Sequence, residues 1–243
     1  MAVFFLFIPF LQKIYLYVIL LTMKLEVNVP SKLSEIPLHK YQKFLKIVDK
    51  NIDDPNADRF VAMKMLEIFC DIPSKYIYDY KIKDITKVTD VLTKMFEERP
   101  ELVRSFKIGD TEFGFIPNLE DMSFGEYIDL DTYIGDWDNI HRAMGVLYRP
   151  ITAKIKDKYE IEKYRGDNYQ EAMLNTPMDA VLSSVVFFYD LGIDLRNGIM
   201  DYLTEPEKEV YRQYLTSIGS GVGTMPYIYS VTETLQRLNR SLT

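Results

Sequence analysis

Cysteine and histidine, the residues that build disulfides and most zinc sites, are almost missing from this sequence. Cysteine occurs once, at Cys70, and histidine twice, at His39 and His141, in 243 residues. A single cysteine excludes a disulfide within the chain. These side chains are also too few for the four Cys and His ligands of a structural zinc site. The chain therefore suits a reducing compartment, and we expect Cys70 to be a buried thiol on the apolar side of a helix.

The sequence also has no excess of basic residues. It holds 29 Lys and Arg against 36 Asp and Glu, which gives a net charge of −7 at pH 7. Binding to nucleic acid needs a local surplus of Lys and Arg that neutralises phosphates, and no basic stripe stands out. We therefore expect no nucleic-acid partner. The remaining composition, 47% hydrophobic and 27% charged, is that of a globular chain able to bury a core.

The longest apolar run lies at the N-terminus. Residues 1–22 are apolar apart from Gln12, Lys13 and Thr22. A stretch of this length is able to span a bilayer, but a lysine at its centre costs roughly 2.5–3.5 kcal/mol on insertion scales. No basic segment precedes the run and no small-x-small cleavage site follows it, as a secretory signal requires. We favour a surplus extension ahead of a start at Met23 and expect no membrane partner. A membrane anchor and an oligomerisation segment stay as alternatives.

One pattern of apolar residues occurs twice in the chain. Residues 33–41 (LSEIPLHKY) align with residues 119–127 (LEDMSFGEY), and every apolar position of the first segment is apolar in the second except Pro37. Further along, residues 62–66 (AMKML) align with residues 143–147 (AMGVL). The number of residues between aligned positions is therefore smaller in the second alignment, because one loop of the second copy is shorter. Repeated apolar spacing predicts a duplicated scaffold.

Apolar spacing and turn residues predict the elements of the first unit, residues 23–103. Alternation over 25–29, stopped by Pro30, indicates a strand, and apolar residues at helical spacing indicate three helices. Asp58 is the expected N-cap of the second helix. The helices are expected from Ser34 or Pro37 to the loop 51–56, over 59–70 and over 82–98.

The second unit, residues 104–166, is expected to carry short β-hairpins around a helical pair, and Gly109 with Asp110 is a hairpin-turn signal. A third region, 167–204, is expected to be helical with Gly192 as a C-cap, and 205–243 to form a helix and a flexible tail. The expected strands are 105–108, 112–116, 151–155 and 159–164, and the expected helices are 123–133, 137–148, 169–174, 178–191, 195–203 and 205–215. The sequence thus predicts a helix-dominated α+β fold with two similar strand–helix–helix units, short β-hairpins and a third helical region.

Acidic side chains gather between residues 120 and 138, where no Lys or Arg occurs. Paired carboxylates can bind a divalent cation or act as an acid and a base. However, Asp121 and Glu126 surround an expected helix start, where the helix dipole favours negative charge, and the others suit a polar face. We therefore predict no enzyme, no catalytic residue, no metal and no cofactor, with a metal-dependent enzyme as the alternative. The acids are Glu120, Asp121, Glu126, Asp129, Asp131, Asp136 and Asp138.

Aromatic and arginine side chains of the second unit are candidates for a protein interface, because Trp, Tyr and Arg are the residues that anchor such interfaces. The alternative for two of them is structural: Trp137 as a core residue at a helix start, and Arg149 as the residue that closes a helix end. The candidate interface residues are Trp137, Tyr148, Arg149, Tyr127 and Tyr133.

Residues 113–151 (FGFIPNLEDMSFGEYIDLDTYIGDWDNIHRAMGVLYRPI) and 178–195 (MDAVLSSVVFFYDLGIDL) resemble a group of proteins from tailed bacteriophages, including those that infect Bacteroidetes. The resemblance covers residue 23 to about residue 203 and carries no catalytic signature. It implies a protein of the virion or of its assembly, since small acidic helical proteins of the tail module are often assembly chaperones. We therefore expect a non-enzymatic tail assembly chaperone or a minor virion structural component.

The same resemblance implies the partners and the location of the protein. The expected partners are other phage proteins, such as tail or head–tail components, and a homo-oligomer stays open. The expected location is the host cytoplasm during assembly, with the virion as a further location for a structural component.

Overall fold

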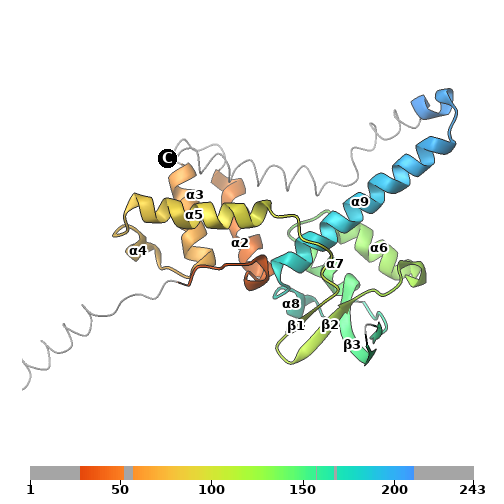
Figure 1. The fold of residues 1–243 in the computed structure, drawn as a ribbon, viewed down its shortest axis with the longest axis horizontal. Coiled ribbons are helices and arrows are strands. Elements are labelled where there is room, and N and C mark those ends of the chain that lie inside the picture. The colour runs from red at the N-terminus through yellow and green to blue at the C-terminus, as the bar shows by residue number, and fades with distance from the viewer. Residues whose placement is uncertain (1–27, 52–56, 157, 167–168, 211–243) are drawn as a thin grey trace, which may run out of the picture.

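The protein has a helix-dominated α+β fold. The structure, a computed structural model, describes residues 28–51, 57–156, 158–166 and 169–210. Helices α2 to α5 form one half of the molecule, and a β-sheet with α6 to α8 forms the other (Figure 1). Helix α9 runs from the junction of the two halves and projects beyond the second half.

The first half is a helical unit with an aromatic core. Four rings form a chain of contacts at centroid distances of 5.1 to 5.3 Å, in the order Tyr41, Phe96, Phe69 and Phe44. Because they come from three helices, these contacts fix the helices relative to one another. The elements are the 3-10 helix η1 (Leu33–Glu35), α2 (Leu38–Asn51), α3 (Ala57–Phe69), α4 (Ser74–Ile77) and α5 (Ile82–Glu97).

The second half is built on an antiparallel sheet in the order β1-β2-β3-β4. Gly109 forms the β1–β2 turn with a φ of 57°, a backbone conformation that glycine adopts without a Cβ clash. The predicted hairpin is therefore present at the predicted place. The strands are β1 (Ser105–Ile108), β2 (Thr111–Phe115), β3 (Tyr148–Ile155) and β4 (Lys158–Ile161).

The helices η2, α6 and α7 are inserted between the neighbouring strands β2 and β3, and α8 follows β4. Helix α6 contacts α7, and α7 also contacts α8 and β3, so α7 is the central helix of this half. The elements are the 3-10 helix η2 (Leu119–Asp121), α6 (Phe124–Tyr133), α7 (Ile140–Leu147) and α8 (Gln170–Met173).

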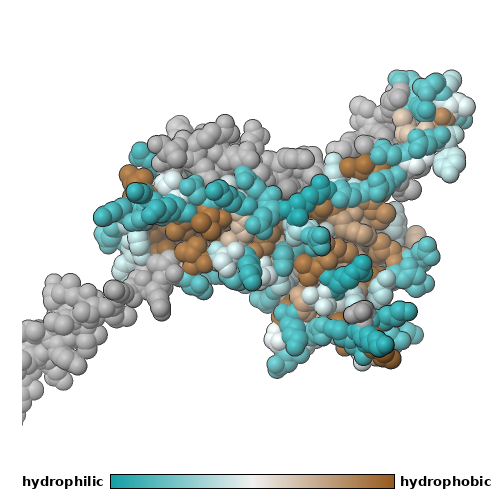
Figure 2. All heavy atoms as spheres, in the orientation of Figure 1, coloured by the Kyte–Doolittle hydropathy of each residue, from teal (hydrophilic) through white to brown (hydrophobic). Residues whose placement is uncertain are grey.

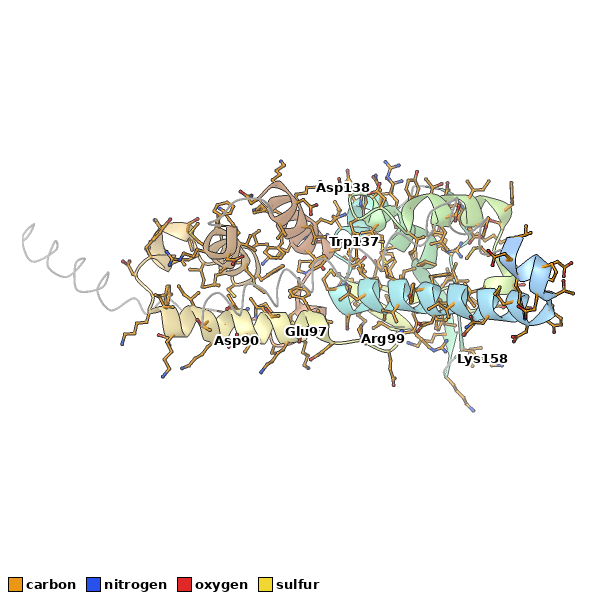
Figure 3. All side chains as sticks on the ribbon, turned by 90° about the horizontal axis from the view of Figure 1, so that it is seen from above. Asp90, Glu97, Arg99, Trp137, Asp138 and Lys158 are labelled. Carbon is orange, nitrogen blue, oxygen red and sulfur yellow. The ribbon has the colours of Figure 1, made fainter. Side chains whose placement is uncertain are left out.

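Helix α9 (Met178–Tyr202) connects the two halves at its start. The Leu38 N–H donates to the Thr176 carbonyl and the Met178 N–H donates to the Ile36 carbonyl, both at 2.9 Å, on either side of a β-bridge between Pro37 and Pro177. Further along α9, the Arg99 guanidinium donates to both carboxylate oxygens of Asp190 at 2.6 and 2.7 Å. Arg99 extends from the segment after α5 toward α9 (Figure 3).

The two aligned copies have the same local structure. The 3-10 helices η1 and η2 begin at the aligned residues Leu33 and Leu119, and the helices that follow begin at the aligned residues Leu38 and Phe124. In the second aligned segment, all the residues at the matching Ala and Leu positions are buried. A strand precedes the second copy, as β2, whereas Val29 before the first copy lies in no strand.

Several expected boundaries are wrong, among them the start of α7, which lies at Ile140 rather than at residue 137, and the end of β4, which lies at Ile161 rather than at residue 164. Gly192 does not end a helix, because α9 continues to Tyr202; the cost of about 1 kcal/mol for a helical glycine is small beside the contacts and hydrogen bonds that continuation keeps. Asp58 lies inside the first turn of α3 rather than before it, where the helix dipole still favours its charge. Arg149, expected to close a helix end, belongs to β3, whereas Tyr148, the expected last residue of that helix, is the C-cap of α7 as well as the first residue of β3.

Several expectations lie wholly or partly outside the described residues. These concern the apolar run 1–22, most of the strand over 25–29 and the tail after residue 210. Residues 205–210 are helical, as the sequence predicts. Among the described residues, no helix combines the length and the hydrophobicity that crossing a bilayer requires.

Candidate protein-binding surface

Helix α6 begins with a reciprocal capping arrangement. The Ser123 hydroxyl accepts a hydrogen bond from the Glu126 N–H at 3.3 Å, and the Glu126 carboxylate accepts one from the Ser123 N–H at 2.7 Å. Such a capping box satisfies backbone donors that a helix start otherwise leaves without partners. The sequence Ser-x-x-Glu therefore fixes where α6 begins.

The same Glu126 side chain also attaches α6 to the sheet. One of its carboxylate oxygens lies 2.7 Å from Nη1 of Arg149 on β3, and the two side chains are only 7% and 8% exposed. The Arg149 guanidinium lies over the ring of Tyr164, 5.8 Å from its centroid. Two buried charges are stable in this setting because each is the other's partner.

Further contacts hold the inner face of α6. The Tyr164 hydroxyl donates a hydrogen bond to the Asp129 carboxylate, and Leu130 is part of the hydrophobic core. At the end of the helix, the Arg142 guanidinium donates to the Tyr133 hydroxyl at 3.1 Å and lies over its ring. The inner face is therefore fixed to β3, the segment after β4, and α7.

The outer face of α6 is apolar and open to solvent. Phe124 is 78% exposed, Tyr127 is 59% exposed and Ile128 is 45% exposed. The spacing of these residues, i, i+3 and i+4, places them side by side on one helix face. We call Phe124, Tyr127 and Ile128 the α6 strip. An exposed apolar patch on a rigid helix is typical of a surface that binds another protein.

Carboxylates surround the α6 strip. Asp131, one turn beyond Ile128 on the same face, is exposed, and so are Glu120 and Asp121 just before the helix. No Lys or Arg occurs between residues 118 and 141. The outer face of α6 thus combines three apolar side chains with negative charge at both ends.

The structure separates the five residues predicted for the interface. Trp137, Tyr148 and Arg149 are buried within the chain, so their predicted place on an open interface is wrong. Tyr133 is partly buried at the end of α6, and Tyr127 lies on the exposed strip. Trp137 points into the junction between α2 and the second half, where its ring lies 5.3 Å from that of Tyr41 (Figure 3).

Tyr148 and Arg149 are buried because they are the first two residues of β3 and pair with Phe115 and Gly114 of β2 inside the sheet. The Tyr148 hydroxyl donates to the Val103 carbonyl at 2.7 Å and lies 2.9 Å from the Ser184 hydroxyl. Burial raises the pKa of Tyr148 well above its usual range. Phe124 and Ile128 are the strip residues that the sequence prediction missed, because helical spacing alone does not show which apolar face of a helix is exposed.

The acidic segment 120–138 is used in several separate contacts. Besides the pairs of Glu126 and Asp129, Asp138 pairs with Lys46 at 3.1 Å, and Asp136 accepts hydrogen bonds from the Asp138 N–H and the Asn139 amide. Within the part of the chain that the structure describes, no three His, Cys, Asp or Glu side chains group as a metal site would need.

The cysteine and the two histidines have different surroundings. Cys70 is buried, as predicted, and burial raises the pKa of its thiol to about 11. His39 Nδ1 lies 3.1 Å from the Leu174 carbonyl, and burial lowers the pKa of His141. These side chains therefore do not form a nucleophile with a base beside it.

A second apolar surface lies on the first half. It is a groove of about 400 Å³ between α3, α4 and α5, and Tyr78 and Ile82 at its edge are largely exposed. Arg59 lines the groove, and Lys81 and Lys83 flank Ile82 in the sequence. Figure 2 shows hydrophobic surface below α5, in the region of this groove, and again below α9. Asp79 and Asp84 lie close to the same lysines in the sequence, so charges of both signs surround this groove.

Comparison of the chain with protein-family models, with curated proteins and with solved structures finds no match.

Proposed function

We propose that this protein is a non-catalytic component of a tailed bacteriophage that binds other phage proteins through the α6 strip. It acts either as a tail assembly chaperone or as a minor structural component of the virion. The observation that carries the proposal is the contrast between the two faces of α6: the inner face is fixed by the Glu126–Arg149 pair, and the outer face exposes Phe124, Tyr127 and Ile128. The resemblance of residues 113–151 and 178–195 to tailed-phage proteins supplies the biological setting.

The rigid attachment of α6 favours binding. A partner that covers the strip has little helix motion to suppress, because the capping box and two contacts to Arg149 and Tyr164 already hold the helix. A preorganised surface binds more tightly than one that must order itself on association. Aromatic side chains such as Phe124 and Tyr127 lose little conformational entropy when they are covered.

The size of the strip sets the strength of the contact. Covering three largely exposed side chains contributes on the order of 4 kcal/mol, before the cost of association is subtracted. This amount alone supports only a weak and reversible complex. A chaperone that must release its client fits such a contact, and a structural component would need further contacts around the strip.

Genetic complementation tests this proposal. A phage that lacks the gene would be supplied with the wild-type protein, with the double variant Phe124→Ser and Tyr127→Ser, or with the control variant Ile155→Ser. Ile155 is 77% exposed on β3, away from α6, so the control removes an exposed apolar side chain without touching the strip. We expect the double variant to fold normally and to lower the yield of infectious particles by about a hundredfold or more, and the control to match wild type. Normal yields with the double variant would contradict the proposal.

Mass spectrometry of purified virions separates the two roles. A tail assembly chaperone should be absent from the virion, whereas a structural component should be present in a fixed copy number. We place the protein in the host cytoplasm during assembly in both cases.

A further inference from the structure

The two aligned helices differ in one face. On α2 this face consists of Leu38, Tyr41, Gln42 and Leu45, and all four are buried. The aligned residues on α6 are Phe124, Tyr127, Ile128 and Asp131, and all four are exposed. The same face of a repeated helix is therefore covered in the first unit and open in the second.

Later parts of the chain cover the face on α2. The Thr176 carbonyl just before α9 accepts from the Leu38 N–H, and the ring of Trp137 packs on Tyr41. The Gln42 amide donates to the Trp137 carbonyl at 2.8 Å. Because these segments follow the first unit in the sequence, the first unit shows that this protein covers such a face with its own downstream chain.

The residues after α9 contain a segment that suits the open face. In residues 226–243 (PYIYSVTETLQRLNRSLT), apolar residues recur with the 3-and-4 spacing of a helix that has one apolar stripe. The only charged residues of this segment are Glu233, Arg237 and Arg240, so its net charge is positive, opposite to that around the α6 strip. The stripe consists of Ile228, Val231, Leu235, Leu238 and Leu242.

The chain is long enough for this segment to return to α6. Helix α9 has 25 residues and is therefore about 37 Å long. The residues between 210 and 228 span up to about 60 Å when extended, which exceeds the length of α9. Since α6 lies below α9 in the view of Figure 1, a segment tethered beyond the end of α9 can reach the strip.

We infer that residues 228–242 bind the α6 strip of the same chain as an amphipathic helix. The leucines of the stripe cover Phe124, Tyr127 and Ile128, as α9 and Trp137 cover the aligned face of α2. The docked segment then excludes other proteins from the strip, so a phage partner must displace it. The need for displacement rests on the proposed function, whereas the docking itself does not.

Disulfide cross-linking in the full chain tests the docking. The variant Tyr127→Cys with Leu238→Cys would be oxidised at about pH 8, where the buried Cys70 thiol stays protonated and unreactive. The matched control is Ile155→Cys with Leu238→Cys, because Ile155 on β3 is exposed at least as much as Tyr127. We expect a cross-link within one chain that forms about tenfold faster from position 127 than from position 155.

A third substitution checks that the stripe guides the docking. Adding Leu235→Ser to the position 127 pair should slow cross-linking about tenfold, whereas adding Gln236→Ser, on the polar side of the same segment, should leave it unchanged. Equal rates from positions 127 and 155 would overturn the inference. Cross-linked dimers in place of cross-linked single chains would also overturn it, because the segment would then bind a second copy.

The outcome of this test is independent of the proposed function. Cross-linking without any loss of infectivity in the Phe124→Ser and Tyr127→Ser variant would keep the docking and remove the function. Loss of infectivity without cross-linking would keep the function and remove the docking.

Discussion

Glu126 on α6 and Arg149 on β3 form a salt bridge of 2.7 Å in which both side chains are more than nine-tenths buried. Glu126 simultaneously completes the capping box at the start of α6. One carboxylate therefore defines the helix start and attaches the helix to the sheet. The exposed strip on the opposite face of α6 depends on this pair for its position.

Removing the arginine should destabilise the protein strongly. Arg149→Met leaves the buried Glu126 carboxylate without its partner, and breaking a buried pair in this way costs about 3–5 kcal/mol. Urea unfolding followed by circular dichroism would measure this loss. Combining Arg149→Met with Glu126→Gln should recover part of it, since no buried charge then lacks a partner.

The matched control for this pair lies on the protein surface. Lys154 and Glu112 are also 2.7 Å apart, but both are substantially exposed. Lys154→Met should cost less than about 1 kcal/mol. Equal losses for Lys154→Met and Arg149→Met would contradict the structural role that we assign to Arg149.

Two glycines should respond in opposite ways to alanine. A Cβ on Gly114 of β2 would lie 2.5 Å from the ring of Tyr159, whose hydroxyl is held by the carbonyls of Arg104 and Phe115. Gly114→Ala should therefore cost about 1–3 kcal/mol. A Cβ on Gly125 of α6 meets nothing within 4 Å, so Gly125→Ala should stabilise the protein by about 0.5–1 kcal/mol. Thermal unfolding of both variants checks the signs.

The thiol of Cys70 should be unreactive in the folded protein. Burial raises its pKa from 9.0 to about 11, so the thiolate is scarce at neutral pH and the sulfur is shielded as well. We expect a thiol reagent to modify Cys70 in denaturant and not in the native protein. Because the folded pKa is the higher one, the stability that the buried thiol contributes is complete below about pH 9 and is lost as the pH rises through about 11. Comparison of wild type with Cys70→Ala across this range measures the loss, and rapid native labelling would refute the prediction.

Trp137 should report on the junction between the two halves. It is the only tryptophan, and its ring is buried against Tyr41. We expect its fluorescence to resist quenching by acrylamide until the protein unfolds. Joint replacement of Trp137 and Arg149 should unfold the chain, because both are structural; a folded double variant would return them to the list of interface candidates.

The fold class and most elements could be predicted from the sequence because their causes are local. The helical spacing of Leu38, Tyr41 and Leu45 indicates α2, and Gly109 with Asp110 indicates the β1–β2 turn. Gly192 misled the prediction because a glycine inside a helix costs only about 1 kcal/mol, and α9 continues through it.

The candidate surface was harder to predict because burial is a tertiary property. Sequence spacing gives Leu38 and Phe124 the same apolar role, yet one is fully buried and the other is 78% exposed. Arg149 and Tyr148 likewise look like interface anchors until the register of β3 places them in the core. Tyr127 alone among the five candidates was assigned to the surface correctly and lies on the strip.

Site-specific photo-cross-linking in infected cells tests most directly whether the α6 strip binds a partner protein. A photoreactive amino acid would replace Tyr127 in one variant and Ile155 in the other, and mass spectrometry would identify every cross-linked protein. We predict that one phage protein cross-links from position 127 and not from position 155. The same set of proteins from both positions, or no phage protein from position 127, would contradict the account.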